Sequence, residues 1–168
     1  FPVLQPMLSA GAFFPAIGNH EVEKDDELSD YALRFFGGAG FDGGETYYRV
    51  HTGGVHFFSL NTEYSIAQGS AQATWLESNL VKASAEPGYR FSVVFFHRPL
   101  ITCSDRPSDD AARSFLEPVF LANKVALVLQ AHMHVYERFE LANGLTYVTS
   151  GGGGGTLADV DENIDQPY

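Results

Sequence analysis

Three short segments of this chain carry side chains that bind transition metals. Their metal-competent members are one asparagine and three histidines: Asn19, His97, His132 and His134. An amide oxygen combined with imidazole nitrogens suits Zn, Mn or Fe, whereas a dedicated Ca²⁺ site is built from oxygens. The sequence therefore predicts a transition-metal centre whose ligands come from widely separated parts of the chain.

Each of these segments directly follows an apolar run that is typical of a buried strand. The three runs are Phe13–Ile17, Phe91–Phe96 and Val125–Leu129. In open α/β sheets, catalytic groups gather at the carboxyl ends of the strands. We therefore expect three segments that are far apart in the sequence to meet in one crevice beside a sheet.

The rest of the chain alternates between helical and extended patterns. The further elements that we expect are a short helix over Val22–Phe36, a hairpin of strands Tyr47–His51 and Val55–Asn61, a helix from a Ser70 cap to the region of Ala83, a helix over Asp109–Asn123 with a break or kink at Pro118, and a strand over Leu145–Ser150. Helices and strands in alternation indicate a mixed α/β fold.

The composition indicates one folded, acidic domain. The chain has 168 residues, 45% of them hydrophobic, which is ample for one packed core. Its net charge of −11 argues against nucleic acid as a general partner, because binding to a phosphate backbone needs clustered Lys and Arg. No apolar run approaches the roughly 18 residues of a membrane span. An acidic protein that handles phosphate must draw its positive field from bound metal, in agreement with the predicted centre.

The order of the motifs resembles the calcineurin-like metallophosphoesterases and, within them, the purple acid phosphatases. The residues that carry the resemblance are Gly18-Asn19-His20-Glu21, His97 at the end of an apolar run, and the run Ala131 to Arg138, in which Ala131 replaces the usual glycine of the family's Gly-His-x-His motif. The resemblance covers nearly the whole chain. It implies an α/β fold in which a two-sheet β-sandwich is flanked by helices. It also implies metal-dependent hydrolysis of phosphoesters, with phosphomonoesters favoured as substrates.

The resemblance assigns the ligands to two metal ions, which in the family are combinations of Fe, Zn or Mn. Asn19, His97 and His132 would bind the second ion and His134 the first. His20 would not be a ligand. It would contact the phosphoryl oxygens or protonate the leaving group, a role that suits a side chain titrating near neutral pH.

Arg98 follows the single histidine of the second motif. Related enzymes often place substrate-contacting residues in this loop, and an Arg there could hold phosphate oxygens bidentately. A solvated loop Arg is the equal alternative. The histidine pair that plant-type purple acid phosphatases carry after this motif is missing, so their substrate preference does not transfer directly.

Two upstream motifs of the family are absent from this sequence. They are Gly-Asp motifs that supply an Asp to each metal, one of them bridging, and this chain contains no Gly-Asp dipeptide and begins at Phe1. Two cations held about 3.5–4 Å apart need anionic bridging ligands. We therefore expect residues 1–168 to be the carboxyl-terminal portion of a single catalytic domain, whose missing amino-terminal half supplies the remaining ligands.

Two other functions stay open on the sequence alone. A phosphodiesterase of the same superfamily would use the same metal core on a small phosphodiester, and a non-catalytic metal-binding fragment would explain the missing Asp motifs. The sequence assigns no compartment, although the resemblance favours an extracytoplasmic, secreted or periplasmic, setting.

Several polar or flexible residues are predicted to have structural roles. His51 and His56 lie outside the motifs, in the predicted hairpin. Gly151–Gly155 lacks the Gly-Lys-Ser/Thr ending of a nucleotide-phosphate loop, so we expect it to let the backbone pass close to the metal cluster or to turn the chain. Arg138 is predicted to pair with a carboxylate and to orient the histidine loop.

Overall fold

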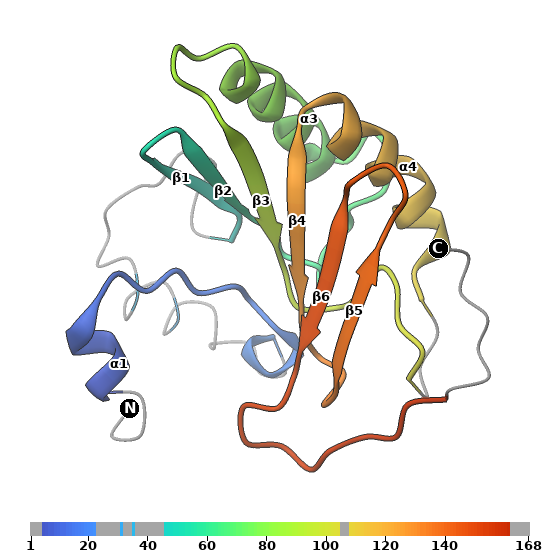
Figure 1. The fold of residues 1–168 in the computed structure, drawn as a ribbon. Coiled ribbons are helices and arrows are strands. Elements are labelled where there is room, and N and C mark those ends of the chain that lie inside the picture. The colour runs from blue at the N-terminus through green and yellow to red at the C-terminus, as the bar shows by residue number, and fades with distance from the viewer. Residues whose placement is uncertain (1–4, 23–30, 32–34, 36–45, 105–107, 162–168) are drawn as a thin grey trace.

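The computed structural model describes residues 5–22, 31, 35, 46–104 and 108–161, and these build one mixed sheet with the strand order β1-β2-β3-β4-β6-β5 (Figure 1). The strands are β1 (Tyr48–Thr52), β2 (Val55–Ser59), β3 (Phe91–Phe95), β4 (Val125–Gln130), β5 (Tyr136–Glu140) and β6 (Thr146–Ser150). The four central strands run parallel, and β1 and β5 close the two edges antiparallel to their neighbours. This confirms the predicted α/β class.

Helices α3 (Ala71–Ser84) and α4 (Asp110–Ala122) pack on one face of the sheet (Figure 1). Leu80 of α3 and Leu116 of α4 share one core with Val94 and Val128 of the central strands, and all four are fully buried. Burial of such a side chain contributes about 1.5–3 kcal/mol, so this shared core fixes the strands whose ends carry the motifs. The remaining helical pieces are α1 (Gln5–Ala10) and a 3₁₀ turn, η1 (Asn19–Glu21).

Side-chain caps begin both long helices. The Ser70 hydroxyl accepts the Ala73 N–H at 3.2 Å, as the sequence predicts, and the Asp109 carboxylate accepts the Ala112 N–H at 3.0 Å. Pro118 does not end α4, which continues to Ala122. Since Leu116 and Phe120, two residues before and two residues after the proline, are fully buried in the core, their packing outweighs the hydrogen bond that the proline cannot make.

The predicted strand over Phe13–Ile17 does not form among the described residues. The segment is irregular, and Pro15 at its centre has no N–H to donate to a ladder. The Pro15 carbonyl instead accepts hydrogen bonds from the Tyr48 hydroxyl at 2.6 Å, the Tyr31 hydroxyl at 3.1 Å and the Ser59 hydroxyl at 3.4 Å. The first motif is therefore anchored by side-chain hydroxyls rather than by strand pairing.

Strand β5 was not predicted, although its exposure alternates strictly, with Glu137 and Phe139 turned inward. The second sheet of the expected sandwich is not among the described residues, and most of the predicted helix over Val22–Phe36 lies outside them. In the part of the chain that the structure describes, no helix combines the length and the apolar character needed to cross a bilayer.

Candidate metal centre

The three predicted motifs converge at the carboxyl ends of the strands. Three donor atoms face one another there: Asn19 Oδ1 lies 2.8 Å from His97 Nε2, His97 Nε2 lies 2.9 Å from His132 Nδ1, and His132 Nδ1 lies 3.1 Å from Asn19 Oδ1. We call this group the Asn19–His97–His132 triangle. Its members come from positions up to 113 residues apart in the sequence.

The triangle has the dimensions of three ligands on one metal ion. Ligand bonds of about 2.0–2.1 Å that meet at right angles place the donor atoms roughly 2.9–3.0 Å apart. The three observed separations, 2.8, 2.9 and 3.1 Å, surround that value. Each atom can also present a lone pair to the common centre. The donor set therefore fits a single transition-metal cation with three cis ligands.

Local backbone features position Asn19 and His97. The Glu21 carboxylate accepts the Gly18 N–H at 2.8 Å and closes the 3₁₀ turn that begins at Asn19. The His97 ring packs directly on Gly18, where a Cβ atom would lie 2.9 Å from Nδ1 of that ring. Gly18 is thus required for the close approach of the two motifs, and Glu21 holds the turn that presents Asn19.

His132 reaches the triangle from a strained backbone. Its φ is +66°, the left-handed region that non-glycine residues rarely adopt and that often marks functional sites. The chain from 131 to 135 is bent, and the Ala131 N–H donates to the His97 carbonyl at 2.9 Å. This backbone bond ties the end of β4 to the end of β3 at the two histidines.

His20 and His134 lie beside the triangle without joining it. Both are exposed, and both line a cavity of about 270 Å³. The remaining lining residues of this cavity are Asn19, His97, His132, Met133 and Ala158. The structure thus brings all five predicted catalytic and metal-binding residues to one cavity, three of them in mutual contact. Their roles in chemistry stay predictions.

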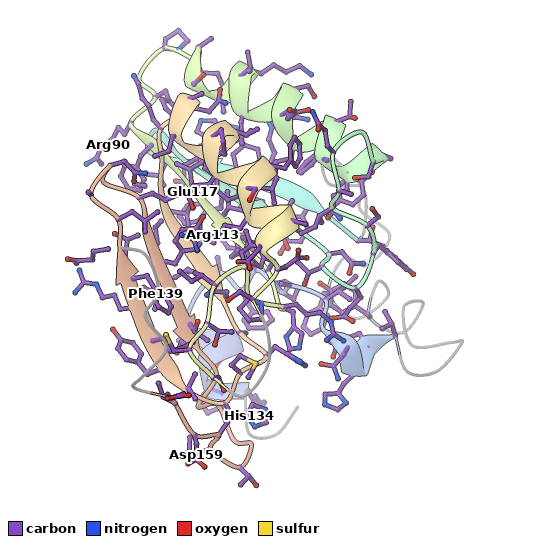
Figure 2. All side chains as sticks on the ribbon, turned by 90° about the vertical axis from the view of Figure 1, so that its right-hand side faces the viewer. Arg90, Arg113, Glu117, His134, Phe139 and Asp159 are labelled. Carbon is purple, nitrogen blue, oxygen red and sulfur yellow. The ribbon has the colours of Figure 1, made fainter. Side chains whose placement is uncertain are left out.

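The tautomer of His134 is set by its neighbour. His134 Nδ1 lies 2.7 Å from the Thr156 carbonyl, so Nδ1 carries the proton and Nε2 keeps its lone pair for a ligand. Figure 2 shows His134 and Asp159 at the same end of the molecule, away from Arg113 and Glu117 on α4. Nε2 is therefore the ring nitrogen of His134 that is available to a ligand.

The glycine run Gly151–Gly155 passes close to the loop that carries His132 and His134. This agrees with the expectation that the run lets the backbone approach the metal cluster. A Cβ atom at Gly151 would lie 1.7 Å from the Met133 carbonyl oxygen, and one at Gly155 would lie 2.2 Å from the His134 ring. The run therefore lets the 151–158 segment lie against the loop that carries His132 and His134.

His97 is held in the protonation state that a ligand needs. Burial and, to a smaller extent, the adjacent His132 lower its pKa to about 4, while Glu63 opposes the shift. At neutral pH the His97 imidazole is uncharged, so its Nε2 lone pair is available to a metal.

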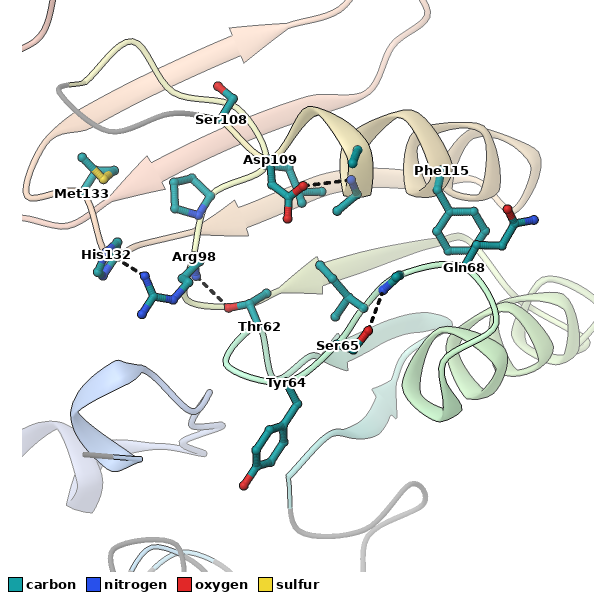
Figure 3. A pocket seen from close by; sticks show the side chains of 16 residues that line it. Thr62, Tyr64, Ser65, Gln68, Arg98, Ser108, Asp109, Phe115, His132 and Met133 are labelled. Carbon is teal, nitrogen blue, oxygen red and sulfur yellow. Dashed lines mark hydrogen bonds between the residues drawn. The ribbon is translucent and has the colours of Figure 1, made fainter. Parts of the chain in front are cut away.

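Arg98 lies between the triangle and a larger cavity of about 830 Å³ (Figure 3). Its Nε donates to Glu63 Oε1 at 2.8 Å and its Nη2 donates to Glu63 Oε2 at 2.9 Å. Its Nη1 lies 3.4 Å from His132 Nε2. Since Glu63 occupies one edge of the guanidinium, Arg98 is a positioned residue beside the centre rather than a freely solvated one. Its contact with substrate stays a prediction.

One buried amide side chain, that of Gln130, connects the loops that carry the motifs. Gln130, the last residue of β4, accepts the Leu100 N–H at 3.0 Å and donates to the Ile101 carbonyl at 2.5 Å and the Thr149 hydroxyl at 2.9 Å. It thereby joins the exits of β3, β4 and β6. The sequence analysis did not predict this role. The only sequence signal for it is a single amide at the end of an apolar strand, directly before the histidine motif.

A buried carboxylate supports the loop after β3 from the other side. Glu137 is 6% exposed and accepts the Thr102 hydroxyl at 2.8 Å and the Cys103 N–H at 2.6 Å. Arg138 does pair with a carboxylate, as predicted, but its partner Glu140 lies on the same strand and both are largely exposed. The role of Arg138 in orienting the histidine loop stays a prediction, and its neighbour Glu137 holds the loop after β3 instead.

The fold and this histidine-rich centre together define a class of metal-dependent phosphoesterases. A family model described as calcineurin-like phosphoesterase matches residues 3–136. The chain therefore belongs to the calcineurin-like phosphoesterases.

Named relatives narrow the comparison to purple acid phosphatases. Purple acid phosphatase 18 of Arabidopsis thaliana is 27% identical to this chain, over 90% of this chain and 38% of the relative. Acid phosphatase type 7 of Homo sapiens is 30% identical, over 81% of this chain and 34% of the relative. A protein of A. thaliana named probable inactive purple acid phosphatase 9 is 39% identical, over 55% of this chain and 15% of the relative.

A solved structure shows the same fold. Purple acid phosphatase PPD1 from yellow lupin (Lupinus luteus) seeds superimposes with a TM-score of 0.63 at 21% sequence identity, over 71% of this chain and 25% of that chain. The chain thus spans less than half the length of these curated relatives and of this structure.

Proposed function

We propose that this chain forms the carboxyl-terminal part of a catalytic domain that hydrolyses phosphoesters, with phosphomonoesters as the favoured substrates. Its centre would hold two metal ions drawn from Fe, Zn and Mn. The observation that carries the proposal is the Asn19–His97–His132 triangle, because its atoms and edge lengths suit three ligands of one ion. Family membership supports the same chemistry. The rest of the catalytic domain, including its bridging carboxylate, would come from sequence that precedes this chain in the whole protein.

Each side chain has a distinct part in this proposal. Asn19, His97 and His132 hold one ion, and His134 holds the other through Nε2. When bound, such ions stabilise negative charge on the phosphoryl oxygens and activate water. His20 stands exposed at the cavity, where it can hydrogen-bond a phosphoryl oxygen or hand a proton to the departing oxygen. Arg98 directs positive charge towards the larger cavity.

The larger cavity suits the organic part of a substrate. Its lining is mixed: polar side chains such as Arg98 and Gln68 alternate with apolar ones such as Phe115 (Figure 3). A phosphate held at the metal centre would therefore have room beside it for an aromatic or alkyl leaving group that also carries polar substituents. A small phosphoester is the substrate class that this arrangement accommodates.

Two alternatives are kept for specific reasons. The metal core would serve a phosphodiester as well as a monoester, and the 830 Å³ cavity has room for a second ester group. The relative named as an inactive purple acid phosphatase favours a non-catalytic metal-binding domain as the second class. An extracytoplasmic setting rests on the resemblance to plant relatives alone.

Hydrolysis assays distinguish these functions. The protein that contains this chain together with its upstream sequence should hydrolyse p-nitrophenyl phosphate faster than bis(p-nitrophenyl) phosphate, and chelation should abolish both rates. A preference for the bis-ester would favour the phosphodiesterase. If neither ester is hydrolysed with any added metal ion, although the protein still binds metal, the non-catalytic metal-binding domain would be favoured.

The 168 residues alone test the need for the upstream half. Without a bridging carboxylate they should hold at most one ion at this centre and show little metal-stimulated phosphatase activity. Robust turnover by this chain, abolished by His97→Ala, would show that its own residues complete the centre.

A further inference from the structure

A second group of metal-competent side chains lies at the opposite end of the sheet. His51 and His56 are directly paired across the β1–β2 hairpin, and His56 is level with Ser92 at the beginning of β3. Glu86 comes from the loop between α3 and β3, beside the tip of this hairpin (Figure 1). We call His51, His56 and Glu86 the hairpin cluster. The parallel register places it at the amino ends of the strands, remote from the Asn19–His97–His132 triangle.

One ligand atom from each member of the hairpin cluster lies within 4.8 Å of the others. His56 Nε2 is 3.4 Å from Glu86 Oε2. Four-coordinate Zn²⁺ with bonds of about 2.0–2.1 Å has donor atoms roughly 3.3–3.4 Å apart, so this pair already stands at a tetrahedral edge. The rings of His51 and His56 stack at 5.0 Å with an interplanar angle of 9°, and a small rotation of the exposed His51 completes the set.

His56 carries an unmet polar group inside the protein. The residue is 1% exposed, and its Nδ1 has no hydrogen-bond partner. The other ring nitrogen, Nε2, faces Glu86 and is therefore the atom placed to bind a cation. Nδ1 is then the protonated nitrogen, and a water molecule can accept its hydrogen bond.

The scaffold around the hairpin cluster is fixed by backbone contacts. The Arg90 N–H donates to the Gly54 carbonyl at 2.8 Å, which joins the hairpin turn to the loop after α3. A Cβ atom at Gly54 would lie 2.2 Å from the Gly88 carbonyl oxygen, so the two turns are in direct contact. The Tyr89 ring packs 5.4 Å from the His56 ring. Because both segments are held in place, little ordering is needed when a ligand binds.

We propose that the hairpin cluster is a second metal site that takes Zn²⁺, with two imidazoles and one carboxylate as protein ligands and a water molecule in the fourth position. Arg49 lies 3.5 Å from Glu86, a weak ion pair that Zn²⁺ displaces. The bound ion clamps the β1–β2 hairpin to the loop that leads into β3. This site is independent of the phosphoesterase proposal, because it shares no residue with that centre.

Zn²⁺ titration of the whole chain tests the site, with the ring resonances of His51 and His56 followed by ¹⁵N–¹H NMR. Both rings should shift on binding, and the thermal midpoint should rise with Zn²⁺ concentration. Glu86→Gln and His51→Ala each remove one ligand and should weaken Zn²⁺ binding at the hairpin cluster by about 100-fold. Removing a residue that only hydrogen-bonds a metal ligand already costs about 10–100-fold in affinity. Glu77→Gln on α3 removes the same charge outside the cluster and should leave Zn²⁺ binding at the cluster unchanged.

Unchanged ring resonances of His51 and His56 at millimolar Zn²⁺ would overturn the proposal. Equal Zn²⁺ affinity at these rings in the wild type and in Glu86→Gln would do the same, because the carboxylate would then not be a ligand. His51 is exposed and Glu86→Gln keeps the side-chain volume, so both variants should fold. Circular dichroism of each variant without metal verifies this, and phosphatase activity of the longer protein should not change in either.

Discussion

The Asn19–His97–His132 triangle and the hairpin cluster use similar side chains in different ways. In the triangle, three donors from distant segments already meet at 2.8–3.1 Å. In the hairpin cluster, two of the three residues are neighbours across one hairpin, and the ligand atoms are spread over as much as 4.8 Å. The triangle is thus preorganised for a cation, whereas the hairpin cluster must contract around one.

The surroundings explain this difference. The triangle stands where three strand exits are tied together by buried groups such as Gln130, by the Ala131–His97 backbone bond and by the close contact of Gly18 with His97. The hairpin cluster stands at a sheet edge, and one of its histidines is exposed. Ligands on rigid, mutually supported elements suit catalysis, and ligands at an edge suit a clamp that adds stability. The predictions below test this contrast.

The largest effect is expected from removing a triangle ligand. In the longer protein with its upstream half, His97→Ala should lower bound metal and phosphatase rate together, to near background, because it removes one of the three donor atoms of the triangle. His51→Ala is the matched control and should keep the rate. Metal analysis and p-nitrophenyl phosphate turnover measure both. If His51→Ala costs as much activity as His97→Ala, the two clusters are not separate.

A smaller loss should follow from His20→Ala in the same longer protein. His20 lines the cavity outside the triangle, so the variant should retain its metals while its rate falls on the order of 10²–10⁴-fold, the usual contribution of a positioned acid or base. The loss should be smaller for aryl phosphates than for alkyl phosphates, because an acidic phenol needs less help to leave. Loss of metal equal to that of His132→Ala would make His20 a ligand.

Gly18→Ala should weaken the triangle without removing a ligand. The added methyl group would lie 2.9 Å from the His97 ring and would push it out of position. We expect metal affinity at this centre to fall by about 10-fold or more, comparable to loss of a ligand support. Gly152→Ala, which meets nothing within 4 Å, is the control. Calorimetric titration of both variants with a divalent metal ion measures this affinity. Equal affinities would mean that the close contact of Gly18 with the His97 ring does not matter for metal binding.

The smallest effect concerns alkaline pH and the anchor of the first motif. Burial raises the pKa of Tyr48, whose hydroxyl donates to the Pro15 carbonyl. An unfolded tyrosine ionises near about pH 10, so the stability that comes from keeping Tyr48 neutral is present below that pH and is lost as the pH rises above it.

Tyr48→Phe should therefore cost about 1 kcal/mol at neutral pH through the lost hydrogen bond. It should also make the free energy of unfolding fall less steeply above about pH 10 than in the wild type. Urea unfolding at several pH values measures both quantities. Parallel slopes for the two proteins would mean that Tyr48 does not titrate with unfolding.

The amino-acid sequence by itself determined the α/β class, most of the strands and helices, and five of the seven residues that line the 270 Å³ cavity. It could do so because apolar runs and helix caps are local signals of secondary structure, and because the order of the three motifs identifies the family. The Ser70 cap and the Val125–Leu129 strand are examples. Where a local pattern was opposed by backbone chemistry, the sequence misled: Pro15 prevents pairing of the run Phe13–Ile17.

Tertiary structure alone decided how distant residues meet. The pairing of His51 with His56 was implicit in the hairpin, but the approach of Glu86 depends on how the loop after α3 packs against the turn at Gly54. The left-handed backbone of His132 is likewise fixed by its surroundings, since the residue has no intrinsic preference for that conformation. Contacts between segments far apart in sequence follow from packing of the whole core, which no local pattern encodes.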